Sequence, residues 1–122
     1  MTSWVAIPAP APGGRHVGST AAWGAGIATQ LVTMKIKAEH EQDFLAVAKS
    51  VVEKVYAGEP NTLTYTLVKH PTEERTYMWI ERYKDQAASD EHGQTPYLQE
   101  ALKTVRPWLE DAELVRYQQV LP

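Results

Sequence analysis

His92, Glu81 and Tyr65 are the side chains of this sequence best suited to proton chemistry on a small molecule. An imidazole takes up and releases a proton close to neutral pH, as a general base in an enzyme must. His92 follows Ala88 by four residues, so a helix would place both on one face, turned toward the interior. We expect His92 to act as this base, but the position also suits a core histidine that hydrogen-bonds to a strand or caps a helix beside Gly93.

An aromatic wall is predicted around Glu81. A strand directs alternate side chains to one face. In the stretch 76–83 these alternate side chains are Tyr77, Trp79, Glu81 and Tyr83. The three rings could stack against a planar substrate, but we favour packing in the core or in a dimer interface, which is the more frequent use of aromatic side chains.

The carboxylate of Glu81 needs a partner, because a charge on an apolar strand face must be paired, hydrogen-bonded or shifted in its pKa. It could orient the imidazole of His92, or it could form a structural ion pair, which we favour. The candidate partners for this ion pair are Arg75, Arg82 and Arg116.

Three further residues complete the predicted cavity. Tyr65, on the neighbouring strand, could hydrogen-bond to a substrate oxygen, although packing is favoured for it. Val32 and Leu102 are apolar positions of the first strand and the last helix, and we expect them to contact the substrate. The predicted catalytic residues are thus His92, Glu81 and Tyr65, and the predicted substrate-binding residues are Trp79, Tyr83, Tyr77, Val32 and Leu102.

Hydrophobic periodicity indicates the strands and helices that must position these side chains. Strands are predicted over 27–36, 62–69, 76–83 and 113–120, and helices over 41–56, from an N-cap at Asp85 to a break at Gly93, and from Pro96, after an N-cap at Thr95, toward Pro107. This order predicts an α+β domain of ferredoxin-like β-α-β-β-α-β topology, with the helices on one face of an antiparallel sheet. The other face would be costly to leave in water, so we expect a homodimer that covers it.

A change of composition at Gly26 divides the chain. Residues 1–26 combine prolines with alanines and glycines, a composition that suits neither a helix nor a strand. We interpret this segment as a flexible tail, or as an arm that uses Trp4 and Trp23 to dock on the domain or on a partner subunit. Residues 27–122 are expected to form a single domain.

Composition excludes several function classes. The 122 residues carry a net charge of -3, so no basic surface is available for nucleic acid. The sequence has no cysteine, which excludes disulfides, thiolate nucleophiles and cysteine-ligated metals and agrees with a reducing compartment. Neither a membrane span nor a secretory signal is found, so we expect a cytoplasmic protein. Because motifs for metals, flavin, haem and nucleotides are missing, we expect no cofactor and no metal ion.

Three segments of the chain resemble a known family. They are Glu59-Pro60-Asn61-Thr62-Leu63-Thr64-Tyr65, Glu81-Arg82-Tyr83-Lys84-Asp85-Gln86-Ala87-Ala88 and His92-Gly93-Gln94-Thr95-Pro96-Tyr97. In this order and spacing they resemble the antibiotic biosynthesis monooxygenase family and its quinol-monooxygenase relatives, over about Leu31 to Val120. The resemblance implies a dimeric α/β barrel with a pocket between sheet and helices in each subunit.

Members of that family differ in their chemistry. Some oxidise phenols or anthrones to quinones with O₂ and no cofactor, and others degrade haem. The haem-degrading relatives carry a tryptophan near the position of His92 and an iron-binding histidine where Leu102 stands here, so this departure argues against haem.

An oxidation of the first kind needs a base, an aromatic slot and a dry cavity, because an electron-rich hydroxyarene must lose a proton before it reacts with O₂. The sequence therefore predicts a cofactor-independent monooxygenase that acts on a small hydrophobic phenolic, anthrone or quinol compound, in secondary metabolism or quinone turnover. The alternative is a non-oxidative protein of the same fold, which binds or cyclises a small molecule or is a dimer without catalysis. Polar groups that converge on one pocket would favour the enzyme.

Overall fold

A computed structural model of the chain describes residues 26–121. Within this range the helices and strands follow in the predicted order. They are β1 (Ala28–Ile36), α1 (Glu41–Gly58), β2 (Thr62–Lys69), β3 (Thr76–Tyr83), α2 (Gln86–Gln94), α3 (Pro96–Val105) and β4 (Leu109–Gln118), with short 3-10 helices at Ala38–His40 and Arg106–Trp108. Apart from Gly26, the tail or arm predicted for residues 1–26 lies outside the described residues.

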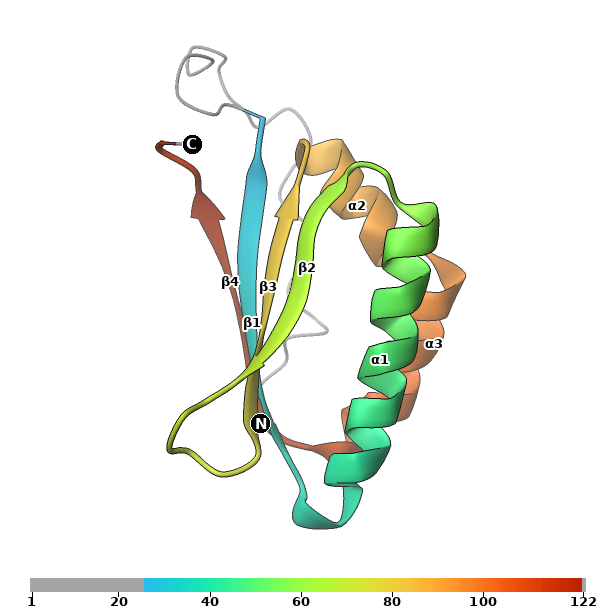
Figure 1. Cartoon of the computed structure of the whole chain (residues 1–122), viewed down its shortest axis with the longest axis vertical. Helices are drawn as coiled ribbons and strands as arrows, with labels where there is room; N and C mark the ends of the chain where they lie inside the picture. The colour runs from blue at the N-terminus through green and yellow to red at the C-terminus, as the bar shows by residue number, and fades with distance from the viewer. Residues whose placement is uncertain (1–25, 122) are drawn as a thin grey trace.

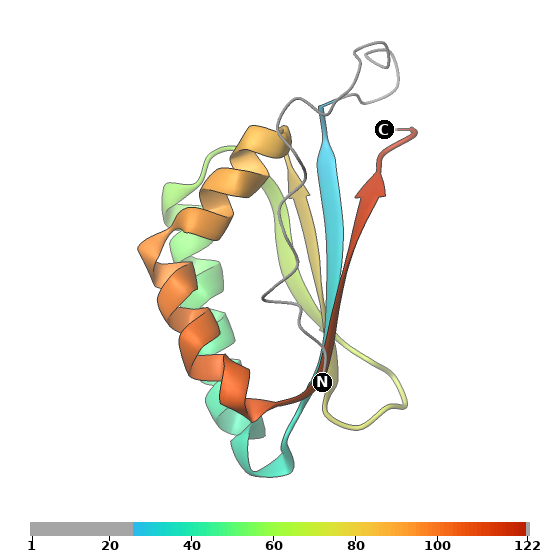
Figure 2. The ribbon, with the colours of Figure 1, turned by 180° about the vertical axis from the view of Figure 1, so that it is seen from behind.

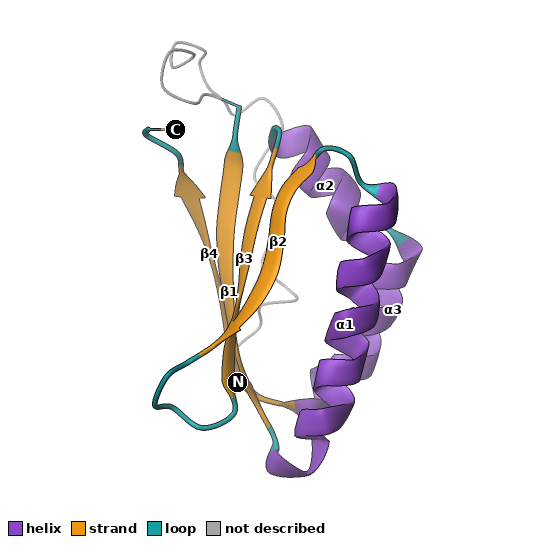
Figure 3. Ribbon diagram, in the orientation of Figure 1, coloured by secondary structure: helices purple, strands orange, loops and turns teal. Residues whose placement is uncertain are grey.

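These elements form two layers. The strands make one antiparallel sheet in the order β2-β3-β1-β4, and α1, α2 and α3 all lie on the same face of it (Figures 1 and 3). Seen from behind, α2 and α3 follow one another along the helical layer, and β4 forms an edge of the sheet (Figure 2). The arrangement confirms the predicted ferredoxin-like α+β fold.

Local sequence explains how the helices form. The buried residues of α1 recur every three or four positions, at Phe44, Ala48, Val51 and Val55, so one face of the helix packs on the sheet. Asp85 caps α2 as predicted, because its carboxylate accepts a hydrogen bond from the backbone N–H of Ala88 at 2.8 Å. No helix within residues 26–121 is long and apolar enough to cross a membrane.

The break between α2 and α3 falls two residues later than predicted. Gly93 belongs to α2, and the chain turns at Thr95, whose backbone is extended with ψ at 141°. Pro96 accounts for this, since a proline disfavours helical geometry in the residue before it. Thr95 occupies the predicted N-cap position of α3, but its hydroxyl donates instead to the carbonyl of His92 at 2.9 Å.

The last strand also begins earlier than predicted. β4 starts at Leu109 rather than at Glu113, because Leu109 and Ala112 are buried and extend the pairing with β1. The register shifts between Lys35 and Ile36, so β4 does not keep a strict alternation near its start.

Strand register aligns side chains in rows across the helix-facing side of the sheet, because directly opposed residues share a face. A polar row runs through Tyr65, Glu81, Gln30 and Arg116. The neighbouring row is apolar and runs through Leu67, Trp79, Val32 and Leu114. The sheet therefore offers a polar strip beside an apolar one to the helices above it.

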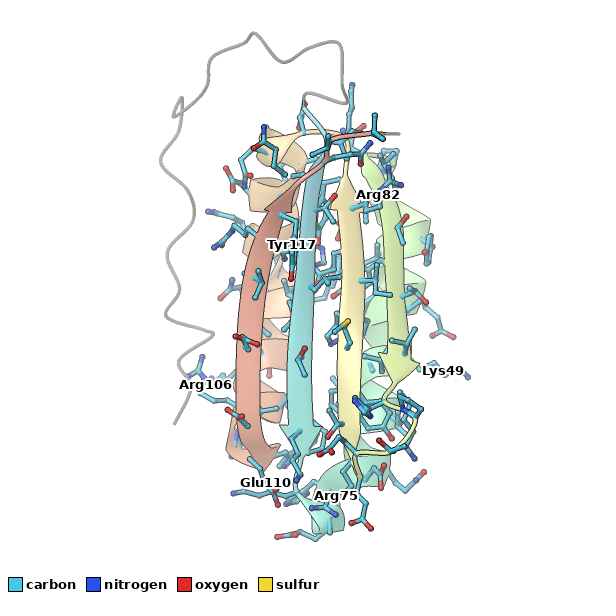
Figure 4. The ribbon with its side chains drawn as sticks, turned by 90° about the vertical axis from the view of Figure 1, so that its left-hand side faces the viewer. Lys49, Arg75, Arg82, Arg106, Glu110 and Tyr117 are labelled. Carbon is cyan, nitrogen blue, oxygen red and sulfur yellow. The ribbon has the colours of Figure 1, made fainter. Side chains whose placement is uncertain are left out.

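The opposite face of the sheet carries no helix (Figure 4). Leu31, Met78, Ile80 and Val115 lie on this face and are half-buried in the single chain. Tyr117, at the β4 edge of the same face, is 52% exposed. Apolar surface of this kind is available for contact with another protein surface.

Candidate active site

A cavity of about 780 Å³ lies between the sheet and the three helices. Side chains from all four strands form its floor, with Tyr65 contributed by β2, and α1, α2 and α3 form its roof. Six of the eight predicted site residues line it, namely His92, Glu81, Tyr65, Trp79, Val32 and Leu102. A volume of this size accommodates a small molecule of several fused rings.

The cavity has a polar end and an apolar end. The polar end is formed by the polar row of the sheet together with the residues of α2 and the start of α3 that face it, which include Ser89, Asp90, His92, Gln94 and Gln99. The apolar end is lined by Met34, Phe44, Val47, Val51, Leu102 and Val105. A bound molecule would therefore place its polar groups near His92 and Glu81 and its hydrocarbon part toward Phe44.

Aromatic rings pack around the polar end. The ring of Tyr65 contacts those of Trp79, in a tilted arrangement, and His92, edge to face, with centroid distances of 4.8 Å to each. All three side chains are nearly inaccessible to water, at 3%, 6% and 4% exposed respectively. Their close packing restricts rotation of the His92 ring and gives a planar ligand an aromatic surface to contact.

Glu59 holds His92 in place. The Nδ1 atom of His92 lies 2.9 and 3.1 Å from the two carboxylate oxygens of Glu59. Because an ionised carboxylate only accepts hydrogen bonds, Nδ1 must carry the proton and donate it. The other ring nitrogen, Nε2, has no hydrogen-bond partner within residues 26–121, so it is free to accept a proton from a ligand.

Two further donors fix the carboxylate of Glu59. The hydroxyl of Thr62 donates to it at 2.8 Å, and the hydroxyl of Tyr97 donates to its second oxygen. Glu59 follows the end of α1, Thr62 begins β2 and Tyr97 belongs to α3. The side chain of Glu59 is 12% exposed and lines a smaller hollow of about 330 Å³ on the other side of His92. His92 thus separates this hollow from the main cavity.

Glu59 was not among the predicted site residues, although it opens one of the segments that carry the family resemblance. It follows a helix and precedes a proline, so no helical or strand periodicity points its side chain anywhere. Its contact with His92 spans 33 residues of sequence. Besides that segment, the available signal was that one ring nitrogen of a functional histidine often donates to a carboxylate or a backbone carbonyl.

Glu81 is the buried carboxylate that lines the main cavity, at 4% exposed. Its Oε1 accepts hydrogen bonds from the hydroxyl of Tyr83 at 2.5 Å and from the side-chain amide of Gln30 at 2.7 Å. Burial raises the pKa of the Glu81 carboxyl above its usual range, and the hydrogen bond from Tyr83 and the charge of His92 partly offset this. Its Oε2 has no hydrogen-bond partner within residues 26–121.

The predicted ion pair of Glu81 is wrong. Arg82 points to the other face of the sheet and donates to Gln119 at 3.1 Å (Figure 4). Arg75 lies at the β2–β3 hairpin and donates to the carbonyl of Ile36 at 2.8 Å. Arg116 shares the polar row of the sheet with Glu81 but stands two strands away. The second predicted role, orienting His92, belongs to Glu59 instead.

Tyr77 and Tyr83 share the strand face of Trp79 but do not line the cavity. Tyr83 is fully buried behind Glu81. Tyr77 lies at the other end of β3, where its hydroxyl donates to Glu41 at 2.6 Å. Burial and this hydrogen bond raise the pKa of Tyr77 to about 12. Both residues therefore contact core groups rather than the cavity space.

The site combines a positioned base with a buried acid and an aromatic surface. Nε2 of His92 can take a proton from a bound hydroxyl or an activated C–H group, and Oε2 of Glu81 can bind a second polar group. Burial, followed by the nearby carboxylates of Glu81 and Glu59, raises the pKa of Tyr65 well above its ordinary value, so its hydroxyl stays protonated. Within residues 26–121, no three histidine or acidic side chains are grouped to hold a metal ion.

Sequence comparison identifies relatives of this chain. The sequence model of the family described as antibiotic biosynthesis monooxygenase matches residues 27–104. The candidate monooxygenase YcnE of Bacillus subtilis is 36% identical over 66 residues, which cover 54% of this chain and 68% of YcnE. The uncharacterized protein sll1783 of Synechocystis is 30% identical over 67 residues, which cover 55% of this chain and 45% of that protein. The match thus spans less than half of sll1783.

Solved structures agree with this relationship. A candidate antibiotic biosynthesis monooxygenase from Caulobacter crescentus has a TM-score of 0.76 and 27% identity, over 82% of this chain and 95% of that one. A similar protein from Bacteroides thetaiotaomicron has a TM-score of 0.74 and 22% identity, over 80% and 92%. The fold is shared with both, and the family match covers well over half of the sequence. The chain therefore belongs to the antibiotic biosynthesis monooxygenase family.

Proposed function

We propose that this protein is a cofactor-independent monooxygenase that oxidises a hydrophobic phenolic, anthrone or quinol compound with O₂. The observation that carries the proposal is the buried His92, tied at Nδ1 to Glu59 and free at Nε2, in the wall of a largely apolar cavity. Such a base can remove a proton where water is excluded. We further propose that the protein acts in the cytoplasm, in secondary metabolism or quinone turnover, which agrees with the absence of cysteine.

The first step is proton transfer from the substrate to Nε2 of His92. The carboxylate of Glu59, at 2.9 Å from Nδ1, stabilises the imidazolium that forms. Tyr65 stays protonated and donates a hydrogen bond to the anionic oxygen of the substrate. The aromatic rings of Tyr65 and Trp79 hold the substrate against the base.

The electron-rich anion then passes one electron to O₂, and the resulting radical pair recombines to a carbon–oxygen bond. Protonation by His92 gives a hydroperoxide at that carbon. Loss of the second C–H proton and cleavage of the O–O bond release water and leave a carbonyl group. For an anthrone the balance is R₂CH₂ + O₂ → R₂C=O + H₂O, in which the carbon loses four electrons and O₂ gains them. Glu81, whose pKa is raised by burial, is suited to protonate the departing oxygen.

Oxygen uptake with anthrone and with a reduced naphthoquinone tests this proposal. His92→Ala should retain the fold and lower turnover by about a hundredfold or more, the usual contribution of a general base. His40→Ala is the matched control, because His40 stacks on Trp108 outside the cavity and its loss should leave turnover unchanged. With ¹⁸O₂, one labelled atom should enter the product and the other should enter water.

Two outcomes would contradict the proposal. Equal turnover by the wild type and His92→Ala would show that His92 is not the base. A product without ¹⁸O would show that the protein is not a monooxygenase. Conversion of a substrate without oxygen consumption would instead support the non-oxidative alternative, a protein that binds or cyclises a small molecule.

We also propose that the protein is a homodimer. Leu31, Met78, Ile80 and Val115 form a half-buried apolar group on the helix-free face of the sheet. A two-fold axis through this face would bury the group twice, once from each subunit.

A further inference from the structure

Arg116 is an unpaired cation at the polar end of the cavity. It lies near the end of β4, directly opposite Gln30 of β1, and its side chain contributes to the cavity lining. Arg116 is exposed, and it makes no ion pair or hydrogen bond with any residue of the described range 26–121. Arginines at such a position are suited to anions, because the guanidinium group presents two parallel donors to a carboxylate.

The two acidic residues of the cavity leave Arg116 free. Glu81 is two strands away, and since neighbouring strands lie about 4.8 Å apart, the two backbones are about 10 Å apart. Between them stands Gln30, whose amide donates to Glu81. Asp90 of α2 also lines the cavity, but its carboxylate accepts from Gln86 at 2.9 Å and is not within ion-pair distance of Arg116.

The polar row therefore has two different ends. At the β3 end, Nε2 of His92 offers an acceptor for a hydroxyl proton, and Glu81 lies beside it as a second polar group. At the β4 end, Arg116 offers a positive charge, and the apolar row beside both receives only hydrocarbon. A ligand that fits the β3 end, the β4 end and the apolar row must be a flat apolar molecule. It must carry a hydroxyl group at one end and an anionic group about 10 Å from that hydroxyl.

We propose that the substrate is a fused-ring hydroxyarene that also carries a carboxylate, and that Arg116 binds this carboxylate. The proposal rests on the proposed function for the reacting hydroxyl, and it adds the anionic group and the residue that recognises it. Arg116 acts in binding and selection, because it lies two strands away from Glu81, at the other end of the polar row.

Binding of three probes by calorimetry tests the inference. They are 6-hydroxy-2-naphthoic acid, its neutral methyl ester and 2-naphthol, which lacks the carboxyl group. The wild type should bind the acid about tenfold or more tightly than the ester, the expected effect of charge-assisted hydrogen bonds. Added salt should weaken binding of the acid but not of the ester.

Two variants locate the effect. Arg116→Gln should bind the acid about tenfold or more weakly while its affinity for the ester stays the same, and Arg116→Lys should fall between. Arg106→Gln is the matched control, since Arg106 is exposed, carries the same charge and does not line the cavity (Figure 4). Thermal unfolding of each variant checks that the fold is kept.

The inference is overturned if the wild type does not prefer the acid to its ester, or if Arg116→Gln keeps the preference. It is equally overturned if Arg106→Gln loses the preference to the same extent, because the net charge of the protein, and not contact with Arg116, would then explain the preference for the acid. These measurements need no turnover. If the protein oxidises hydroxyarenes but does not prefer acids, the proposed function stands and this inference is refuted. If it binds the acid through Arg116 but oxidises no hydroxyarene, this inference stands and the proposed function is refuted.

Discussion

Replacing Glu59 by glutamine separates the charge of this residue from its shape. In the wild type the carboxylate accepts hydrogen bonds from His92, Thr62 and Tyr97. A glutamine that keeps its oxygen at the position of Oε1 still accepts from His92 and Thr62, and its amide can donate to the hydroxyl of Tyr97. The hydrogen-bonded arrangement can therefore survive, but the imidazolium that forms on His92 loses its counter-charge.

The expected loss follows from the difference between two kinds of hydrogen bond. A bond to a charged group contributes about 1.5 to 3 kcal/mol and a neutral one about 1 kcal/mol, so the change removes about 0.5 to 2 kcal/mol, with a midpoint near 1.25 kcal/mol, from the stabilisation of the imidazolium. Since each 1.36 kcal/mol is a factor of ten in rate, kcat should fall about tenfold. KM should change little, because Glu59 does not line the main cavity.

Glu41→Gln is the matched control. Glu41 also accepts a tyrosine hydroxyl, from Tyr77 at 2.6 Å, but it contacts neither His92 nor the cavity. Oxygen uptake and urea unfolding would be measured for both variants. We expect similar, small losses of stability and a loss of kcat for Glu59→Gln alone. If Glu59→Gln keeps the kcat of the wild type, the carboxylate does not assist the base and our account of the site is refuted.

Two further predictions concern stability and assembly. Because the folded pKa of Glu81 is raised, its proton stabilises the fold in acid and this contribution is lost as pH rises through the folded pKa. The glutamine of Glu81→Gln still accepts hydrogen bonds from Tyr83 and Gln30, but it does not titrate. As pH rises above the ordinary glutamate pKa, the unfolding free energy of the variant in urea should therefore fall less than that of the wild type. An equal pH dependence would contradict this. In sedimentation at micromolar concentration the wild type should be a dimer and Ile80→Glu a monomer, whereas Lys49→Gln, an equal charge change on α1 in the helical layer, should remain a dimer. A monomeric wild type would defeat the prediction.

Periodicity predicted the fold because each element carries its own pattern. The alternation in β3 placed Trp79 and Glu81 on the helix-facing side, and the four-residue spacing from Ala88 to His92 turned the histidine inward. Trp79, Glu81 and His92 do line one cavity, together with Tyr65. What periodicity could not indicate is how far the cavity extends along a face, which is why Tyr77 and Tyr83 share the predicted side of β3 and yet lie outside the lining.

The partners of the buried polar groups required the tertiary structure. His92 from α2, Thr62 from β2 and Tyr97 from α3 all donate to one carboxylate that belongs to no helix or strand. Thr62 lies only three residues after Glu59, but the contacts from His92 and Tyr97 span 33 and 38 residues and have no local signature in the sequence. A buried carboxylate without such donors would be strongly destabilised, so Glu59 can hold His92 only once the surrounding elements have packed. The orientation of the base is therefore a property of the assembled fold, and substitutions in any of these elements should affect it.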